Sequence, residues 1–255
     1  MPAAYDTYDY PAYWKGREYE HASEFLAIKK MLLKIPRIER SIEIGAGYGR
    51  LLPSYQFRSK RIVITDPSSK LISKAKARFN SLSKKGKSII FIQSSLENLK
   101  NKFKSKSFDL AVMVRVLHHI KDIDKAFQDV SNLLKPRGYF ILEFANKNHL
   151  KANIKNMFKG NFTYPISIFP VDIRSKRHIK NKTLPFINYH PDQIIEKLKI
   201  QGFEIIEKRS VSNIRSSFMK RFFPTSFLLD IEGILQIPFS KLNFGPSQFI
   251  LARKK

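Results

Sequence analysis

Short apolar runs alternate along most of this chain with longer stretches in which apolar residues recur at helical spacing. Two of the runs, residues 89–92 and 110–114, are apolar without alternation. Uninterrupted apolar runs are typical of strands that helices cover on both faces, as in parallel sheets. We predict seven strands, at residues 40–44, 61–65, 88–93, 109–114, 138–144, 203–207 and 248–252.

Helices are predicted between these strands. One spans residues 68–82, another begins after the N-cap residue Asp122 and extends to residue 134, and a third occupies residues 190–202, with proline near its start and glycine at its end. Units that alternate in this way predict an α/β fold. We expect a Rossmann-like, doubly wound sheet of seven mostly parallel strands.

Three segments depart from this alternation. Residues 1–35 contain a cluster of aromatic side chains followed by an amphipathic helix. We expect them to form a lid over the binding edge of the sheet. Residues 145–190 carry nine lysines and arginines against one acid, and residues 210–246 lack regular periodicity. We interpret these two as inserted cap segments. The whole chain, 1–255, is then one domain with its core at residues 36–144.

Composition excludes several kinds of chemistry. The chain has no cysteine, which excludes disulfides, cysteine-based zinc sites and thiol nucleophiles, including the cysteine adduct used in one type of pyrimidine C5 methylation. Nothing in the sequence requires a metal. No apolar run is long enough to span a bilayer and the N-terminus does not resemble a secretory signal, so a cytoplasmic location is expected.

The charge is strongly positive. Lys and Arg outnumber Asp and Glu by 47 to 21, which gives a net charge of +26. Such a charge favours nucleic acid or an anionic membrane as partner. The lysines are spread over nearly every segment, however, and a general compositional bias explains that distribution equally well.

A glycine-rich turn, Gly45-Ala46-Gly47-Tyr48-Gly49, follows the first predicted strand. Glycines at a sharp strand-to-helix turn allow positive φ and let the backbone approach a ligand, which is typical of nucleotide sites. The spacing here is G-x-G-x-G, whereas dinucleotide-binding folds usually have G-x-G-x-x-G.

With Glu43 ahead of the first glycine, this segment resembles the first motif of class I S-adenosylmethionine-dependent methyltransferases, E/D-x-G-x-G-x-G. Residues 108–119 are similar to the F-D-x-V…LHH motif of the ubiquinone and menaquinone methyltransferase branch, methyltransferase type 11. Residues 133–138 resemble its L-K-P-G-G turn, with Arg137 in place of one glycine. The similarity covers residues 40–144 and implies S-adenosyl-L-methionine as cofactor.

The resemblance also implies the cofactor contacts. Asp66, at the end of the second strand, would hold the ribose hydroxyls, and its alternative role is to cap the following turn. Ser95 stands near the position of a family aspartate that contacts adenine. Glu43 would contact the cofactor or only brace the turn. The predicted cofactor-binding residues are Glu43, Gly45, Ala46, Gly47, Gly49, Asp66, Pro67, Ser95, Leu96, Arg115, Leu117 and Tyr13.

Two adjacent histidines follow the fourth strand, where ligands of open α/β sheets bind. His118 or His119 would act as a general base if the acceptor loses a proton. In the alternative, one packs and the other caps the loop before Asp122. Tyr13 and Arg17 would close over the methionine end of the cofactor, or serve only as a packing residue and a solvated charge.

The leading hypothesis is methyl transfer to a small molecule held by the two inserted segments. An RNA methyltransferase is an alternative because of the charge, although no N-P-P-Y motif follows the fourth strand. A peripheral membrane enzyme with a lipid or quinone-like acceptor is another, because residues 218–223 interleave bulky apolar and cationic side chains, which core packing explains equally well. The last alternative is a non-catalytic cofactor-binding protein. The acceptor and the oligomeric state are not predicted.

Overall fold

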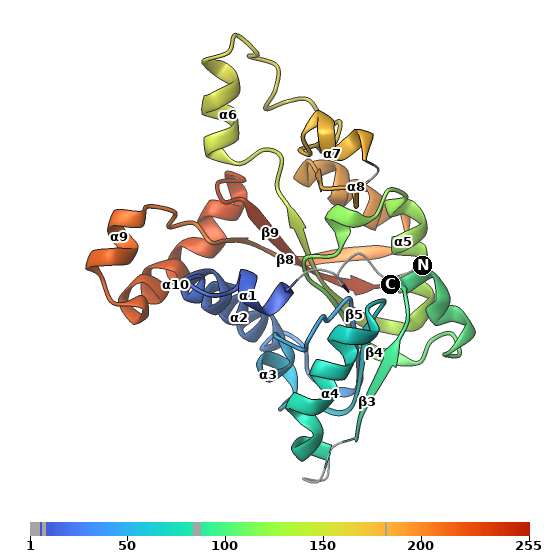
Figure 1. The fold of residues 1–255 in the computed structure, drawn as a ribbon. Coiled ribbons are helices and arrows are strands. Elements are labelled where there is room, and N and C mark those ends of the chain that lie inside the picture. The colour runs from blue at the N-terminus through green and yellow to red at the C-terminus, as the bar shows by residue number, and fades with distance from the viewer. Residues whose placement is uncertain (1–5, 7–8, 84–87, 182) are drawn as a thin grey trace.

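Seven strands form one sheet in the order β3-β2-β1-β4-β5-β9-β8, with helices on both of its faces (Figure 1). The computed structural model describes residues 6, 9–83, 88–181 and 183–255. Strands β1 to β5 are parallel, and β9 is antiparallel to both β5 and β8. The prediction of a mostly parallel seven-stranded sheet is confirmed. The strands are β1 Ile38–Ile44, β2 Ser59–Asp66, β3 Ser88–Gln93, β4 Phe108–Met113, β5 Leu134–Ala145, β8 Phe203–Val211 and β9 Ser247–Lys254.

The apolar run of β4 explains how the core is divided between the two faces. Leu110 and Val112 belong to one cluster of buried side chains, whereas Ala111 and Met113 belong to the other. Because successive side chains of a strand point to opposite faces, a strand covered on both faces needs apolar residues at every position. The centre of the sheet is therefore buried on both sides, whereas Ile90 of the edge strand β3 is exposed.

The predicted helices form α2 Glu18–Leu32, α4 Ser69–Ser83, α5 Ile123–Leu133 and α8 Pro191–Ile200. Asp122 caps α5, because its carboxylate accepts a hydrogen bond from the Lys125 N–H at 3.0 Å. Gly202 follows α8 with a φ of +81°, as expected for a glycine after a helix. Two short helices, α1 Tyr10–Tyr13 and α3 Leu52–Tyr55, lie before and after the first strand.

The expectation of an irregular segment at residues 210–246 is wrong. Strand β8 extends to Val211, and the segment then forms α9 Ser217–Phe222 and the long helix α10 Thr225–Lys241, which packs against α2 and β8. Polar Glu232 and Gln236 on α10 are fully buried, while Ile234 is 75% exposed. This inverted distribution hides the apolar stripe by which a packed helix is normally recognised.

Residues 145–190 extend beyond the end of β5. They form α6 Leu150–Met157, the short strands β6 Val171–Asp172 and β7 Ile187–Asn188, and α7 Lys176–Lys180. Figure 1 shows α6 projecting well away from the central sheet. Within the part of the chain that the structure describes, no helix is long and apolar enough to cross a membrane. The role of this segment as a substrate cap stays a prediction.

Candidate functional site

The glycine turn lies at the carboxyl end of β1. Gly45, Gly47 and Gly49 have φ values of +68°, +58° and +73°. A Cβ atom at position 45 would lie 2.3 Å from Cγ2 of Val116, and one at position 49 would lie 2.8 Å from the ring of Phe79. Glycine is required here for both backbone conformation and space. The third glycine seats the turn against α4, and the first seats it against the loop after β4.

Asp66 joins the end of β2 to the glycine turn. Its two carboxylate oxygens accept hydrogen bonds from the backbone N–H groups of Gly47 and Ser68, each at 2.8 Å. Burial raises the pKa of Asp66, although both of these hydrogen bonds act in the opposite direction. The turn-capping role is therefore present in the structure. Because a carboxylate oxygen has more than one lone pair, Asp66 retains acceptor capacity for sugar hydroxyls.

A cavity of about 490 Å³ opens beside this turn. Four predicted cofactor residues line it: Gly45, Pro67, Ser95 and Leu96. They come from the ends of β1, β2 and β3 and are distant in sequence, and the fold brings them together. Asp66 is not among the lining residues, and its contact with the cofactor stays a prediction. Ala46, Gly47 and Gly49 shape the adjacent turn and do not line the cavity itself. Its lining combines apolar Ile44, Leu96 and Ala126 with polar Ser94 and Ser95, which suits a nucleoside.

The N-terminal segment covers the glycine turn. A Cβ atom at Gly47 would lie 3.4 Å from the ring of Tyr10, whose centroid is 6.1 Å from that of Tyr48. Asp6 accepts a hydrogen bond from the Ser68 hydroxyl at 2.5 Å. The described residues of this segment thus contact the glycine turn and Ser68, and its role as a lid stays a prediction. Tyr10 was not predicted as a site residue, because an aromatic cluster in sequence does not indicate which ring contacts the turn.

The loop after β4 separates the first cavity from a second one. Val116 and His119 line the first cavity, whereas Arg115 and His118 line a polar pocket of about 300 Å³. Leu117, a predicted cofactor residue, is fully buried in the core and reaches neither of these cavities. Residues from the N-terminal segment and both inserted segments complete the second pocket: Tyr13, Arg17, Glu20, His149, Phe186, Ser212 and Arg215.

The two histidines have different environments. Nδ1 of His119 lies 2.7 Å from the carbonyl oxygen of Pro185, so this nitrogen carries the proton and donates it. The ring of His118 packs on Phe186, with centroids 4.4 Å apart. Burial lowers the pKa of both rings, and that of His118 lies well below its usual value. His119 thus anchors the segment around Pro185, and His118 is a neutral imidazole in the second pocket.

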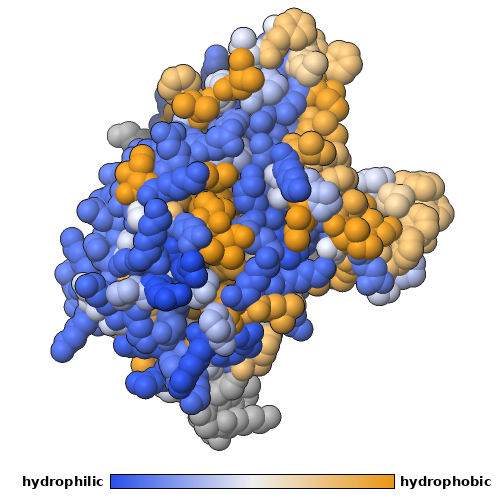
Figure 2. Space-filling view, turned by 180° about the vertical axis from the view of Figure 1, so that it is seen from behind, coloured by the Kyte–Doolittle hydropathy of each residue, from blue (hydrophilic) through white to orange (hydrophobic). Residues whose placement is uncertain are grey.

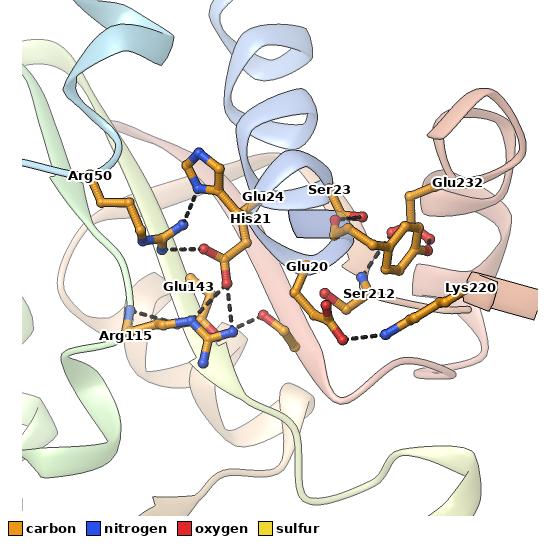
Figure 3. A network of polar contacts seen from close by, with 12 residues as sticks. Glu20, His21, Ser23, Glu24, Arg50, Arg115, Glu143, Ser212, Lys220 and Glu232 are labelled. Carbon is orange, nitrogen blue, oxygen red and sulfur yellow. Dashed lines mark hydrogen bonds and ion pairs between the residues drawn. The ribbon is translucent and has the colours of Figure 1, made fainter. Parts of the chain in front are cut away.

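A buried ion-pair network ties the N-terminal helix to this loop (Figure 3). Glu24 on α2 is completely buried and accepts hydrogen bonds from Arg50, which follows the glycine turn, and from Arg115. Burial alone would raise the pKa of Glu24, but the two guanidinium groups hold it below its usual value. Sequence analysis missed Glu24, because a single acid in an amphipathic helix is normally solvated.

Buried carboxylates contact both the backbone and the side chain of Arg115. Its backbone N–H donates to Glu143 at 2.7 Å, and the other oxygen of Glu143 accepts from the Ser247 hydroxyl at 2.6 Å. Arg115 has a φ of +59°, and these contacts stabilise that conformation. Its guanidinium is paired with Glu24, so in the structure Arg115 positions the loop and borders the second pocket.

Glu43 is turned away from the first cavity. Its carboxylate accepts a hydrogen bond from the Tyr55 hydroxyl at 2.6 Å, and both side chains are buried. Burial raises the pKa of Glu43 to about 7. This geometry corresponds to the bracing role that the sequence left open. Across residues 6, 9–83, 88–181 and 183–255, no three His, Asp or Glu side chains converge as metal ligands would.

Part of the chain is similar to a known family of proteins and to individual relatives. Residues 42–142 match the family described as a methyltransferase domain. The chain is 32% identical over 140 residues to an uncharacterized protein of Methanocaldococcus jannaschii, covering 52% of this chain and 54% of that protein. It is 25% identical over 173 residues to the demethylmenaquinone methyltransferase of Thermotoga maritima, covering 66% and 71%. The chain spans about half the length of the first of these relatives.

Solved structures share the fold. A methyltransferase of Thermotoga maritima described as a possible histamine N-methyltransferase has a TM-score of 0.58 at 19% identity, covering 99% of this chain and 98% of that one. A putative S-adenosylmethionine-dependent methyltransferase from Listeria monocytogenes gives 0.62 at 16% identity, covering 93% and 99%. A Haloferax volcanii methyltransferase, solved with its Trm112 activator, gives 0.61 at 13% identity, covering 98% and 96%. These likenesses confirm the predicted fold.

Proposed function

We propose that this chain, whose residues 42–142 match the family described as a methyltransferase domain, transfers the methyl group of S-adenosyl-L-methionine to a small molecule. One observation carries this proposal. The loop after β4 presents Val116 and His119 to one cavity and Arg115 and His118 to another, so that two neighbouring sites, one for a methyl donor and one for an acceptor, border the same loop. A transferase needs this arrangement of donor and acceptor.

The first cavity fits the cofactor. Gly45 lines this cavity without a side chain, so its backbone is open to a ligand, and Asp66 stands beside the turn with free lone pairs. Asp66 would hold the ribose, and Pro67, Ser95 and Leu96 would surround the base. When bound, the cofactor supplies a methyl group made electrophilic by its sulfonium.

The second pocket would bind the acceptor. Its residues align the nucleophilic atom with the methyl carbon and exclude water, which is the main contribution a protein makes to this transfer. His118 is buried and neutral at physiological pH, because burial lowers its pKa. It would accept the proton that an oxygen, nitrogen or carbon acceptor loses as the new bond to carbon forms.

The size and closure of the second pocket favour a small molecule over RNA. Its volume is about 300 Å³, and its walls come from the N-terminal segment and both inserted segments. A small ligand fills such a space, whereas a base of RNA would have to be extruded into it. Arg17 and Arg215 line this pocket, and neither forms an ion pair within the described residues, which suits an acceptor that carries an anionic group.

The test is turnover with a panel of acceptors, measured as formation of S-adenosylhomocysteine. The panel contains phenols, amines, carboxylic acids, a prenylated quinol and, in a separate reaction, total RNA. We expect turnover with a small molecule and a fall in kcat of about 100-fold or more in His118→Asn, with cofactor affinity unchanged. His178→Asn, which alters an exposed histidine on α7, is the matched control. Methyl label recovered only in RNA would contradict the proposal.

A further inference from the structure

Large apolar side chains are exposed in two projecting parts of the molecule. We call residues 150–181 the long arm and residues 216–227 the short arm. Of the 22 large apolar side chains that are exposed in the described chain, ten lie on the long arm and four on the short arm. Figure 2 shows apolar residues gathered on projections at the margin of the molecule, while most of the remaining visible face is hydrophilic.

The exposure on the long arm is extreme for these residue types. Phe158 is 91% exposed, Phe162 72%, Ile166 77% and Phe169 75%. On the short arm, Phe218 and Phe222 stack on each other with centroids 4.4 Å apart, yet each is more than 60% exposed. Scattered single apolar residues are normal on a surface, but a continuous set of this size marks an interaction site.

The charge of the long arm identifies the chemistry of its partner. Arg174 is paired with Asp172, which is the only acid in the arm. No ion pair is found within the described chain for the other cationic side chains of the arm, which are Lys151, Lys155, Lys159, Lys176, Arg177 and Lys180. Exposed aromatic and aliphatic groups interleaved with unpaired cations are typical of segments that bind the interface of anionic bilayers.

Both arms begin next to the second pocket. His149 immediately precedes the long arm and Ile173 belongs to it, and both line the pocket. On the other side Arg215, which immediately precedes the short arm, lines the same pocket. The pocket is therefore lined by residues at the bases of both arms. Figure 1 shows α6 and α9 projecting away from the central sheet.

We propose that the long and short arms bind the surface of an anionic lipid bilayer. The apolar side chains enter the boundary between headgroups and acyl chains, and the lysines contact lipid phosphates. Nucleic acid fits this surface less well, because the aliphatic side chains Ile154, Met157 and Ile166 contribute nothing to base stacking. The proposal is independent of the identity of the methyl acceptor.

Vesicle flotation of the full chain tests the proposal. Vesicles consist of phosphatidylcholine alone or with about a third of phosphatidylglycerol. The triple variant Phe158→Ser, Phe162→Ser, Phe169→Ser removes apolar groups from the long arm. The matched control is Leu33→Ser, Phe57→Ser, Ile90→Ser, which alters exposed apolar residues elsewhere. A second pair compares Lys155→Glu, Lys159→Glu with Lys76→Glu, Lys100→Glu, all at exposed positions.

We expect the wild type to float with the anionic vesicles and not with the neutral ones. Both arm variants should bind at least about tenfold more weakly, and both controls should bind like the wild type. Equal binding to both vesicle types, or arm variants that bind as well as their controls, would overturn the proposal. The proposal would also be overturned if the chain bound no vesicles but formed a dimer, or a complex with another protein, that light scattering detects and that is lost when Phe158 is replaced.

Calorimetry with S-adenosylmethionine on the same variants separates this proposal from the proposed function. The substituted residues are exposed and lie outside both cavities, so cofactor affinity should be unchanged. A variant that loses vesicle binding and retains the cofactor supports a membrane-binding role for the arms. Failure of all proteins to bind vesicles, with the cofactor still bound, would overturn the membrane proposal and leave the transferase intact.

Discussion

Glu24 on α2 and Arg115 at the end of β4 form a buried ion pair in which Nε and Nη2 of the arginine both lie 2.7 Å from one carboxylate oxygen (Figure 3). The pair joins residues 91 positions apart in sequence. It connects the N-terminal helix, whose preceding segment covers the glycine turn, with the loop that separates the two cavities. The same interaction therefore ties the N-terminal helix to the loop that borders both cavities.

Replacement of Glu24 by glutamine should destabilise the protein strongly. Arg50 and Arg115 would then be buried without a counter-charge, which typically costs about 3–5 kcal/mol of the free energy of unfolding. The control is Glu20→Gln, which removes a partly exposed pair with Lys220 and should cost about 1 kcal/mol or less. Urea unfolding at neutral pH measures both. Equal losses for the two variants would show that the buried network contributes no more than a surface pair.

The effect of Glu24 should also depend on pH. The folded protein holds the pKa of Glu24 below its usual value of 4.5. A carboxyl group with a lowered pKa stabilises the fold above its unfolded pKa and loses that contribution as the pH falls through the folded pKa. The difference in unfolding free energy between wild type and Glu24→Gln should therefore be constant near neutrality and shrink in acid. A difference that grows in acid would contradict this assignment.

Gly47→Ala should affect the site more than its backbone strain alone explains. The residue has a φ of +58°, and a Cβ there would contact Tyr10 at 3.4 Å. Gly202 has a φ of +81° with no atom within 4 Å of its hypothetical Cβ, so Gly202→Ala reproduces the strain far from the site. We expect each variant to lose about 1–2 kcal/mol of unfolding free energy. Only Gly47→Ala should lose cofactor binding by calorimetry. Equal cofactor affinities of the two variants would contradict a role of the glycine turn in cofactor binding.

Glu43→Gln should stabilise the protein at alkaline pH. Burial raises the pKa of Glu43 from its usual 4.5 to about 7, a difference that corresponds to roughly 3 kcal/mol when the group is fully ionised. A raised carboxyl pKa gives stability that is present below pH 4.5 and is lost as the pH rises through 7. Unfolding of wild type and variant across this range should show curves that converge in acid and separate above neutrality, with the variant more stable.

Tyr55→Phe tests the same buried carboxylate by removing its hydrogen-bond donor. It removes the hydroxyl that donates to Glu43 and leaves the carboxylate buried, so the alkaline penalty should grow. The two substitutions thus act in opposite directions on the same pH dependence. Wild-type stability that is flat between pH 4.5 and 7 would contradict the raised pKa of Glu43.

The parallel core was predictable from sequence because its signals are local. An uninterrupted apolar run such as residues 110–114 reports burial on both faces, and the positions of the glycines before Arg50 report the turn that β1 makes. Gly45, Pro67, Ser95 and Leu96 were predicted from the family resemblance. They line one cavity because each follows the end of a parallel strand, and such ends share one edge of a sheet.

What the sequence did not reveal depends on contacts between distant segments. Glu24 meets Arg115, and Glu232 on α10 accepts a hydrogen bond from Tyr19 at 2.6 Å across 213 residues. A buried acid has no local sequence pattern that distinguishes it from a solvated one. For the same reason α10 was missed, since its buried Glu232 and Gln236 weaken the apolar stripe. Leu117 was predicted in the site from its place in the motif, but the loop turns it into the core.

The most direct measurement is calorimetric titration of S-adenosylmethionine into wild type, Asp66→Asn and Asp109→Asn. Asp66 and Asp109 each accept two backbone N–H bonds, but Asp109 binds Glu39 and Arg40 away from both cavities. We predict saturable binding by wild type and Asp109→Asn, and affinity at least about tenfold weaker for Asp66→Asn. No heat with the wild type, or equal affinities for the two variants, would contradict the cofactor site.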